Sequence, residues 1–331
     1  MREPDFWWRP GRGGLLSPLG GIYGAVAALR MQAQGHSAGV PVICLGNLTV
    51  GGAGKTPAAL AVARLLLAAR ERPFFLSRGY GGRLRGPVRV NTATHSAAEV
   101  GDEALLLANL APTIVAHNRV AGADAARHDG ATVIVMDDGL QNPSLAKNLA
   151  IIVVDSRRGI GNGRVIPAGP LRAPLQTQMA QAQALVIVGP GGKAVAVAEA
   201  ARQRGIAIFH ARLDPDRDTL VALRQRKVLA FAGIGDPEKF FATVAAADIT
   251  IAERASFADH HRYTAAEARS LTARADAANL VLLTTEKDLA RLKGEPSLAT
   301  FAARASALPV RLVIEQRDAF RQLILAAVKR R

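Results

Sequence analysis

Short apolar runs alternate with helix-like stretches along the first two thirds of the chain. Uninterrupted apolar runs are typical of strands that are buried on both faces of a sheet. The stretches between them are rich in good helix formers such as alanine and leucine. Strands are predicted at residues 40–46, 73–77, 113–117, 132–137, 150–155, 184–189 and 206–210. Helices are predicted at residues 56–70, 101–110, 119–128 and 193–204.

This alternation predicts an α/β fold with a mostly parallel sheet flanked by helices. The rhythm breaks at the polar stretch DPDRD, residues 214–218, and a second alternating block follows. The block has predicted strands at 227–233, 248–252 and 280–285 and predicted helices at 236–247 and 264–278. We therefore expect a second, smaller α/β domain. The strand expected at 310–314 and the helix expected at 318–329 could close either domain.

The expected organisation has three parts. They are an N-terminal segment over residues 1–30, a first domain over 31–212 and a smaller domain over 213–331, with a linker at about 211–226. A chain of 331 residues is long enough for two domains with substantial cores.

Composition restricts the class of partner. The net charge of +15 draws the chain toward anionic surfaces such as phospholipid head groups or phosphorylated substrates. The basic residues are scattered, and neither a zinc-finger spacing nor an aromatic-rich RNA-binding signature is present, so no nucleic-acid partner is expected. The single cysteine, Cys44, cannot form an internal disulfide and is interpreted as a core residue.

The N-terminal segment 1–30 has a composition typical of a membrane surface. The sequence FWWR at residues 6–9 precedes an uncharged stretch from 13 to 29 that closes on Arg30. Aromatic residues beside arginines suit a membrane–water interface. The stretch is short and contains Pro18, so it is a poor spanning helix. A peripheral contact with an anionic lipid surface and a first helix packed on the domain are both consistent with it.

A glycine-rich turn follows the first strand. Residues 46–57 read GNLTVGGAGKTP, so the turn ends in Gly-Lys-Thr at the start of a predicted helix. Backbone amides in such a loop surround phosphates, while the lysine reaches the outer phosphates and the threonine hydroxyl ligates Mg²⁺. A glycine is usual where Thr49 stands. The loop predicts a P-loop NTPase-like domain that binds ATP through Thr49, Val50, Gly51, Gly52, Ala53, Gly54, Lys55 and Thr56.

Carboxylates and histidines supply candidate chemistry. Asp137 and Asp138 end a buried strand, where they predict a Mg²⁺ site together with Thr56, although Asp-Gly is also a common turn pair. Asp102 begins a helix, either as a favourable charge at its N-terminus or as a general base. Adjacent His260 and His261 in the second block suit proton sharing with a carboxylate better than metal binding.

Several loops follow predicted strands. They read SRGYGG at 77–82, GNGR at 161–164 and PAGPLR at 167–172. Loops at the carboxyl ends of parallel strands line the crevice of an open sheet, although each is equally compatible with an ordinary surface loop.

Taken in order, these segments and four further ones resemble a family. The further segments are GDE at 101–103, DDGLQ at 137–141, DHH at 259–261 and TTEKD at 284–288. The chain resembles the tetraacyldisaccharide 4′-kinases of lipid A biosynthesis over nearly its whole length. Each segment by itself is weak evidence for the family, but the order and spacing that the segments share with it are specific.

The resemblance implies transfer of the γ-phosphoryl group of ATP, with Mg²⁺, to the 4′-hydroxyl of an acylated glucosamine disaccharide 1-phosphate. It implies a site at the cytoplasmic face of the inner membrane, peripheral or monotopic. Asp102 is expected as general base, assisted by His261 or, as second choice, His260. The residues expected to contact the substrate are Asn47, Arg78, Gln141 and Arg172.

Two positions depart from the family pattern. Asn142 stands where a histidine is usual, and Ala173 stands where a glutamate is usual, so no role is carried over to either. Two other classes are weighed. One is a membrane-associated nucleotide-switch ATPase, whose loop begins with a lysine where this chain has Val50. The other, a nucleic-acid-stimulated ATPase, rests on net charge alone.

Overall fold

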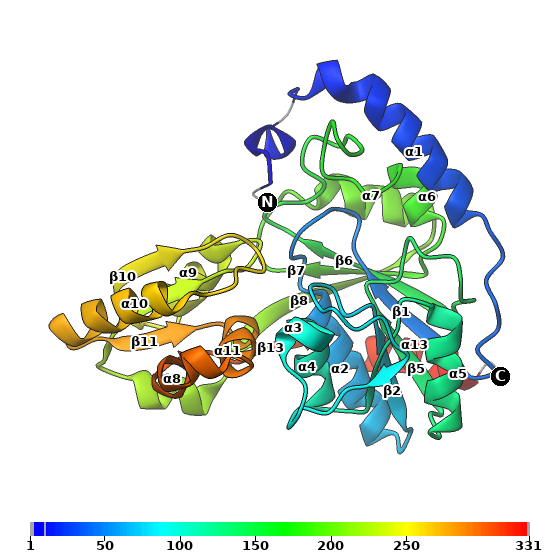
Figure 1. The fold of residues 1–331 in the computed structure, drawn as a ribbon. Helices are drawn as coiled ribbons and strands as arrows, with labels where there is room; N and C mark the ends of the chain where they lie inside the picture. The colour runs from blue at the N-terminus through cyan, green and yellow to red at the C-terminus, as the bar shows by residue number, and fades with distance from the viewer. Residues whose placement is uncertain (1–2, 10, 330–331) are drawn as a thin grey trace.

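The computed structural model describes residues 3–9 and 11–329, and over these residues the strands form two sheets (Figure 1). Residues 1–2 and 10 of the expected N-terminal segment, and 330–331 of the expected second domain, lie outside the described residues. The larger sheet has the order β13-β8-β7-β6-β1-β5-β2-β4-β3. Its strands are β1 (Val42–Gly46), β2 (Pro73–Ser77), β3 (Val88–Arg89), β4 (Thr113–Val115), β5 (Val133–Asp137), β6 (Leu149–Asp155), β7 (Ala184–Val188), β8 (Ala207–Pro215) and β13 (Val310–Ile314).

Helices cover both faces of the larger sheet, which explains why its central strands read as continuous apolar runs. Alternate residues of β1 enter opposite cores: Val42 and Cys44 pack with α5, α6 and α7, whereas Ile43 and Leu45 pack with α2 and α13. The helices are α2 (Lys55–Ala68), α3 (Ala97–Val100), α4 (Asp102–Ala108), α5 (Arg119–His128), α6 (Leu175–Met179), α7 (Val195–Gln203) and α13 (Arg317–Lys329).

The smaller sheet has the order β10-β9-β11-β12 and is parallel throughout its described pairs. Phe231 faces one core with α10 and α12, and Ala230 faces the other with α8 and α9. The elements are α8 (Arg217–Leu223), β9 (Lys227–Ala232), α9 (Pro237–Ala246), β10 (Thr250–Ser256), α10 (Ala265–Ala277), β11 (Val281–Thr284), α11 (Glu286–Lys293), α12 (Ala299–Arg304) and β12 (Ser306–Ala307). The α/β prediction with a mostly parallel sheet is confirmed.

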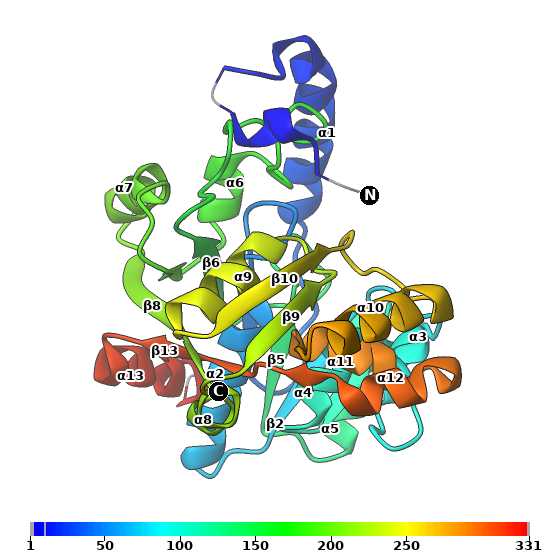
Figure 2. The ribbon, with the colours of Figure 1, turned by 90° about the vertical axis from the view of Figure 1, so that its left-hand side faces the viewer.

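The expected linker over 211–226 is instead largely regular structure. β8 continues to Pro215 because its outer half pairs with β13, and α8 follows. β13 runs antiparallel to β8, so the last strand and helix complete the larger sheet rather than the smaller one. The smaller sheet is thus inserted between β8 and β13 (Figure 2). We propose that the two sheets are the cores of two domains.

Helix α1 (Ser17–Met31) stands at the edge of the molecule away from the smaller sheet in both views (Figures 1 and 2). Its Gly20 and Gly24 are buried, and a Cβ at Gly20 would lie 2.8 Å from the carbonyl oxygen of Val165. The helix therefore packs through a glycine face. Its other face exposes apolar side chains, namely Leu19, Ile22, Tyr23, Val26 and Leu29, and Leu15 is exposed just before the helix. Within the described residues, no helix is long and apolar enough to cross a membrane.

Candidate functional site

The glycine-rich loop joins β1, in the middle of the larger sheet, to the first turn of α2. Gly51 and Gly54 have φ values of +94° and +93°, which side chains disfavour, so these two glycines shape the turn. Thr49 needs no glycine conformation, because it pairs with Leu171 in an isolated antiparallel bridge. The loop therefore keeps the expected shape with threonine at the position where glycine is usual.

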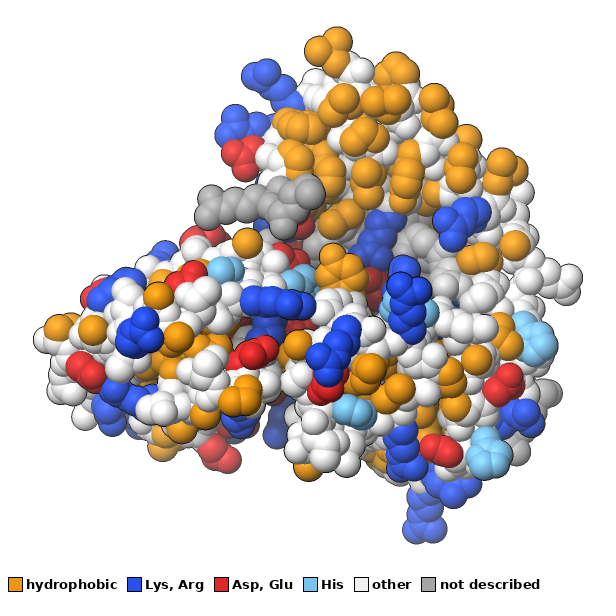
Figure 3. Space-filling model, in the orientation of Figure 1, with side chains coloured by type: hydrophobic (Ala, Val, Ile, Leu, Met, Phe, Trp, Pro, Cys, Tyr) orange, Lys and Arg blue, Asp and Glu red, His pale blue; other side chains and the backbone are white. Residues whose placement is uncertain are grey.

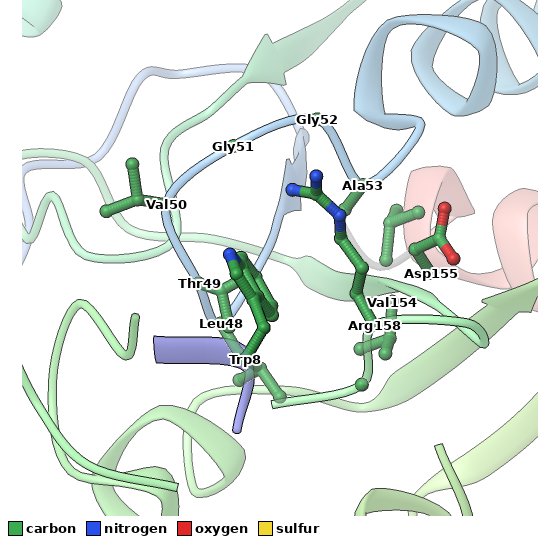
Figure 4. Close-up of a pocket in the computed structure, with 12 residues that line it drawn as sticks. Trp8, Leu48, Thr49, Val50, Gly51, Gly52, Ala53, Val154, Asp155 and Arg158 are labelled. Carbon is green, nitrogen blue, oxygen red and sulfur yellow. The ribbon is translucent and has the colours of Figure 1, made fainter. Parts of the chain in front are cut away.

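The segment 165–172 braces the loop from outside. The Val50 amide donates to the carbonyl oxygen of Pro170 at 2.9 Å, and Arg172 Nε donates to that of Thr49 at 3.1 Å. On the other side, the Trp8 indole lies against residues 48–53, with the Arg158 guanidinium 4.6 Å from its ring centroid (Figure 4). These contacts hold residues 48–50 in place. Thr49 therefore supports the backbone of the loop and does not line the large cavity described below.

Two aspartates end β5 beside the loop, as predicted. Lys55 Nζ lies 3.6 Å from Asp138 Oδ1, and Arg172 Nη1 donates to the same oxygen at 2.7 Å. Burial alone would raise the pKa of Asp138, but the charges of Lys55 and Arg172 outweigh it and lower that pKa to about 2. Asp138 is thus an ionised carboxylate whose backbone φ is +55°, a strained conformation often found at functional sites.

Asp137 has a different environment. Both of its carboxylate oxygens are buried and lack a hydrogen-bond partner among the described residues. Burial, and next the negative charge of Glu103, raise its pKa to about 7. An unpaired buried carboxylate beside a phosphate loop has the donor chemistry that Mg²⁺ prefers. Among the described residues, no cluster of three or more His, Cys, Asp or Glu side chains could hold a metal by itself.

Asp102 and His260 meet where the two sheets face each other. Asp102, the first residue of α4, is 3% exposed, and its Oδ2 lies 3.6 Å from His260 Nδ1. Burial would lower the pKa of His260, but contact with the Asp102 carboxylate outweighs it and raises that pKa. The His260 ring is also 4.9 Å from that of Tyr80, and its backbone φ is +54°. The structure thus aims this histidine at Asp102.

His261, the histidine favoured from the sequence, lies elsewhere. Its Nε2 is 3.0 Å from Glu267 Oε1, and its ring stacks on Phe257 at 4.7 Å. Glu267 also completes the capping box of α10 with Thr264. The expected pairing of Asp102 with His261 is therefore corrected to His260, because adjacent residues of this turn point in different directions.

A helix that the sequence analysis does not predict, α11, brings further charges to Asp102 and Glu103. Lys287 Nζ donates to Glu103 Oε1 at 2.5 Å, and Arg291 Nε donates to Asp102 Oδ2 at 2.7 Å. Burial would lower the pKa of Lys287, but the Glu103 and Asp102 charges outweigh it and hold that pKa well above its usual range. The signal for this helix is Thr285 with Asp288 three residues on, an N-terminal capping pattern.

A cavity of about 670 Å³ collects most of these groups, although Asp137 is not among the residues that line it. Residues 50–57 of the loop, Asp138, Glu103, Lys287 and His260 line it, whereas Asp102 lies behind His260. Tyr23, Ala27 and Arg30 of α1 line its mouth. Figure 3 shows the apolar side chains gathered over α1 and a hollow beside them that contains basic and acidic groups.

The expected substrate contacts divide into two groups. Arg78, Gln141 and Arg172 line the cavity, as does Arg119, which the sequence analysis does not single out. Asn47 does not line it: this side chain is fully buried, and its Nδ2 donates to the carbonyl oxygen of Gly51. Asn47 is therefore corrected from a substrate contact to a residue that supports the phosphate loop.

The chain is similar to known proteins over nearly its whole length. A profile of the Tetraacyldisaccharide-1-P 4′-kinase family matches residues 13–329. The chain belongs to this family. The Tetraacyldisaccharide 4′-kinase of Rhodopseudomonas palustris (strain BisB18) is 54% identical over 98% of this chain and 95% of its own length. The protein of the same name from Afipia carboxidovorans is 50% identical over the whole chain and 98% of its own length.

A solved structure shares the fold. The "apo" form of the Aquifex aeolicus member, in complex with ATP, superposes with a TM-score of 0.72 at 26% sequence identity. The match covers 96% of this chain and 99% of the other. A kinase family with an ATP-bound member accounts for the phosphate loop.

Proposed function

We propose that this chain transfers the γ-phosphoryl group of ATP to the 4′-hydroxyl of a tetraacyldisaccharide 1-phosphate, in lipid A biosynthesis. One observation carries the proposal: the phosphate loop and His260, which lies against Asp102, line one cavity, and that cavity is also lined by residues of α1, whose outer face is apolar. A phosphate donor, a proton acceptor and a lipid-compatible entrance are the three parts that the reaction requires.

For the donor side, we assign Lys55 and the amides of residues 51–54 to the ATP phosphates, since the Val50 amide already donates to Pro170. Asp137, Asp138 and Thr56 would hold Mg²⁺, and the unpaired oxygens of Asp137 are the observation that fits a cation there. A bound Mg²⁺ would neutralise charge on the β- and γ-phosphate oxygens. Protein side chains need supply few ligands, because Mg²⁺ at such sites keeps waters and substrate oxygens.

For the acceptor side, we assign the proton to His260. Its ring faces the cavity, whereas the Asp102 carboxylate lies behind it with an exposure of 3%. Asp102 orients the ring and stabilises the imidazolium that forms when the sugar hydroxyl loses its proton. Arg78, Arg119 and Arg172, which line the same cavity, suit the anionic groups of the two substrates.

A nucleotide-switch ATPase is the alternative from another class. Three residues of α1 at the cavity mouth favour a lipid acceptor instead. The test is an assay with labelled ATP and Mg²⁺ in three arms: with the tetraacyldisaccharide 1-phosphate, with DNA, or with no acceptor. We expect labelled disaccharide in the first arm alone, lost when a chelator removes Mg²⁺. Equal ATP hydrolysis in all three arms would support the switch instead.

We further propose that the protein binds peripherally to an anionic lipid surface, at the cytoplasmic face of the inner membrane. The exposed apolar face of α1 supports this, because the surfaces of soluble proteins rarely carry so many apolar side chains in one patch. A net charge of +15 adds attraction to anionic head groups. The glycine face that packs on residues 165–174 keeps α1 attached to the domain while its other face meets lipid.

Replacing Leu19, Ile22 and Val26 together by serine should weaken binding to vesicles of anionic phospholipid by about tenfold or more, because each side chain contributes about 1.5–3 kcal/mol when fully buried. Vesicle co-sedimentation measures this, and higher salt should also weaken the wild type. The control replaces Val195 and Val221 by serine, since both are as exposed but lie outside α1. Equal binding by both variants would remove α1 from the membrane contact.

A further inference from the structure

Arg291 reaches from the smaller sheet's helix α11 to the buried end of α4. Its side chain is 9% exposed, and that of its partner Asp102 is 2% exposed. Nε of Arg291 donates to Asp102 Oδ2 at 2.7 Å, the same oxygen that lies nearest to His260. The carboxylate therefore has a partner from each of two separate parts of the smaller domain.

Arg291 is itself held in place. Its Nη1 donates to Asp288 Oδ1 at 2.8 Å and to the carbonyl oxygen of Gly233 at 2.7 Å. Asp288 is fully buried, and its Oδ1 also accepts from the Tyr263 hydroxyl at 2.9 Å. The network thus runs from Tyr263 through Asp288 and Arg291 to Asp102, and none of these four residues is part of the cavity lining.

The geometry requires a guanidinium. One planar group donates through Nε to a carboxylate of the larger domain and through Nη1 to a carboxylate of the smaller one. A lysine ammonium is a compact point charge on a flexible stem and lacks this fixed fork. Burying such a network is weak evidence for stability, because desolvation offsets the attraction of the charges. We therefore look for the role of the network in orientation rather than stability, since it fixes the direction of the Asp102 carboxylate.

We propose that Arg291 is a positioning residue for phosphoryl transfer, supplied by the smaller domain, that fixes the Asp102 carboxylate and thereby the orientation of His260. This inference rests on the proposed role of the Asp102–His260 pair. It also means that the acceptor half of the site is complete only when α11 is docked on α4. Docking is then a condition for catalysis rather than a consequence of folding alone.

The charges around Asp102 set the expected pH dependence. They are Glu103 on its own helix, Lys287, Asp288 and Arg291 on α11, and Asp259 and His260 in the turn after β10. Removing the positive charge of Arg291 raises the pKa of both Asp102 and His260. Since His260 must be neutral to accept a proton, the acidic limb of the rate profile should move to higher pH.

The test measures kcat, the KM for ATP and the pH profile for Arg291→Ala, Arg291→Lys and Tyr263→Phe. Arg291→Ala should lower kcat on the order of 10²-fold, the cost of a misplaced catalytic group, with the KM for ATP nearly unchanged. Arg291→Lys should recover part of the loss, and Tyr263→Phe should show a smaller loss of the same kind. Arg274→Ala, at an exposed ion pair with Glu253, is the matched control.

An unchanged kcat and an unmoved acidic limb in folded Arg291→Ala would overturn the inference. If that variant fails to fold, Arg291→Lys and Tyr263→Phe decide by kcat, because both keep a positive charge at residue 291 and leave the acidic limb in place. An unchanged kcat in both would overturn the inference. Asp102→Asn separates the two proposals, because losing the carboxylate lowers the pKa of His260 and moves the limb the other way. A fully active Asp102→Asn variant would refute the catalytic pair itself. If Asp102→Asn is inactive while the Arg291 variants keep their activity, only the role of Arg291 is refuted.

Discussion

Lys55→Ala should lower phosphoryl transfer by about 10²–10³-fold, the usual cost of removing one preorganised group that stabilises transition-state charge. Lys55 is 9% exposed and lies beside Asp138 at the end of the phosphate loop. In this position it neutralises charge that grows between the outer phosphates during transfer. Labelled ATP and the disaccharide acceptor measure the rate, and thermal unfolding checks that the variant is folded.

A control should show that the loss of activity in Lys55→Ala does not come simply from removing one positive charge. Lys227, an exposed lysine at the start of β9, provides the control, and Lys227→Ala should transfer at the wild-type rate. Asp138 keeps its ion pair with Arg172 when Lys55 is removed. A Lys55→Ala enzyme with normal turnover would exclude the loop from the mechanism.

Asp102→Asn and His260→Ala should each lower kcat by about 10²–10⁴-fold, the range for loss of general-base catalysis, with little change in ATP affinity. The double variant should be hardly slower than the slower single variant, because residues that act as a unit are non-additive. Multiplicative losses would show that the two residues act independently.

His261→Gln is the matched control for this pair, because the neighbouring histidine contacts Glu267 and Phe257 instead of Asp102. It should retain near wild-type kcat and lose some thermal stability. In the wild type, the rate should fall as pH falls through the raised pKa of His260, since protonation removes the acceptor. An inactive His261→Gln with a fully active His260→Ala would reverse the assignment.

The elements that carry the donor half of this candidate site can be predicted from the sequence because that half is local. The strand, the glycine-rich turn and Lys55 follow one another within a few residues. Buried parallel strands such as β1 and β5 are predictable because they are uninterrupted apolar runs. The departure at Thr49 was also harmless for a local reason, its pairing with Leu171.

The acceptor half could not be predicted in the same way. Arg291 and Asp102 are separated by more than half of the chain, so no local sequence pattern indicates that they contact each other. The choice between His260 and His261 depends on one residue with positive φ in a turn, which a sequence pattern does not reveal. Likewise, β13 returns to β8 because that edge of the larger sheet lacks another partner, a property of the assembled sheet rather than of residues 310–314.

The pairing of β8 with β13 has a consequence during synthesis of the protein. The outer edge of β8 stays without its neighbour until the ribosome has made the whole smaller domain. An unpaired strand edge on a nascent chain invites association with other chains. The smaller domain therefore delays closure of the larger one, and the time for which that edge is exposed is at least the time that synthesis of residues 216–309 takes.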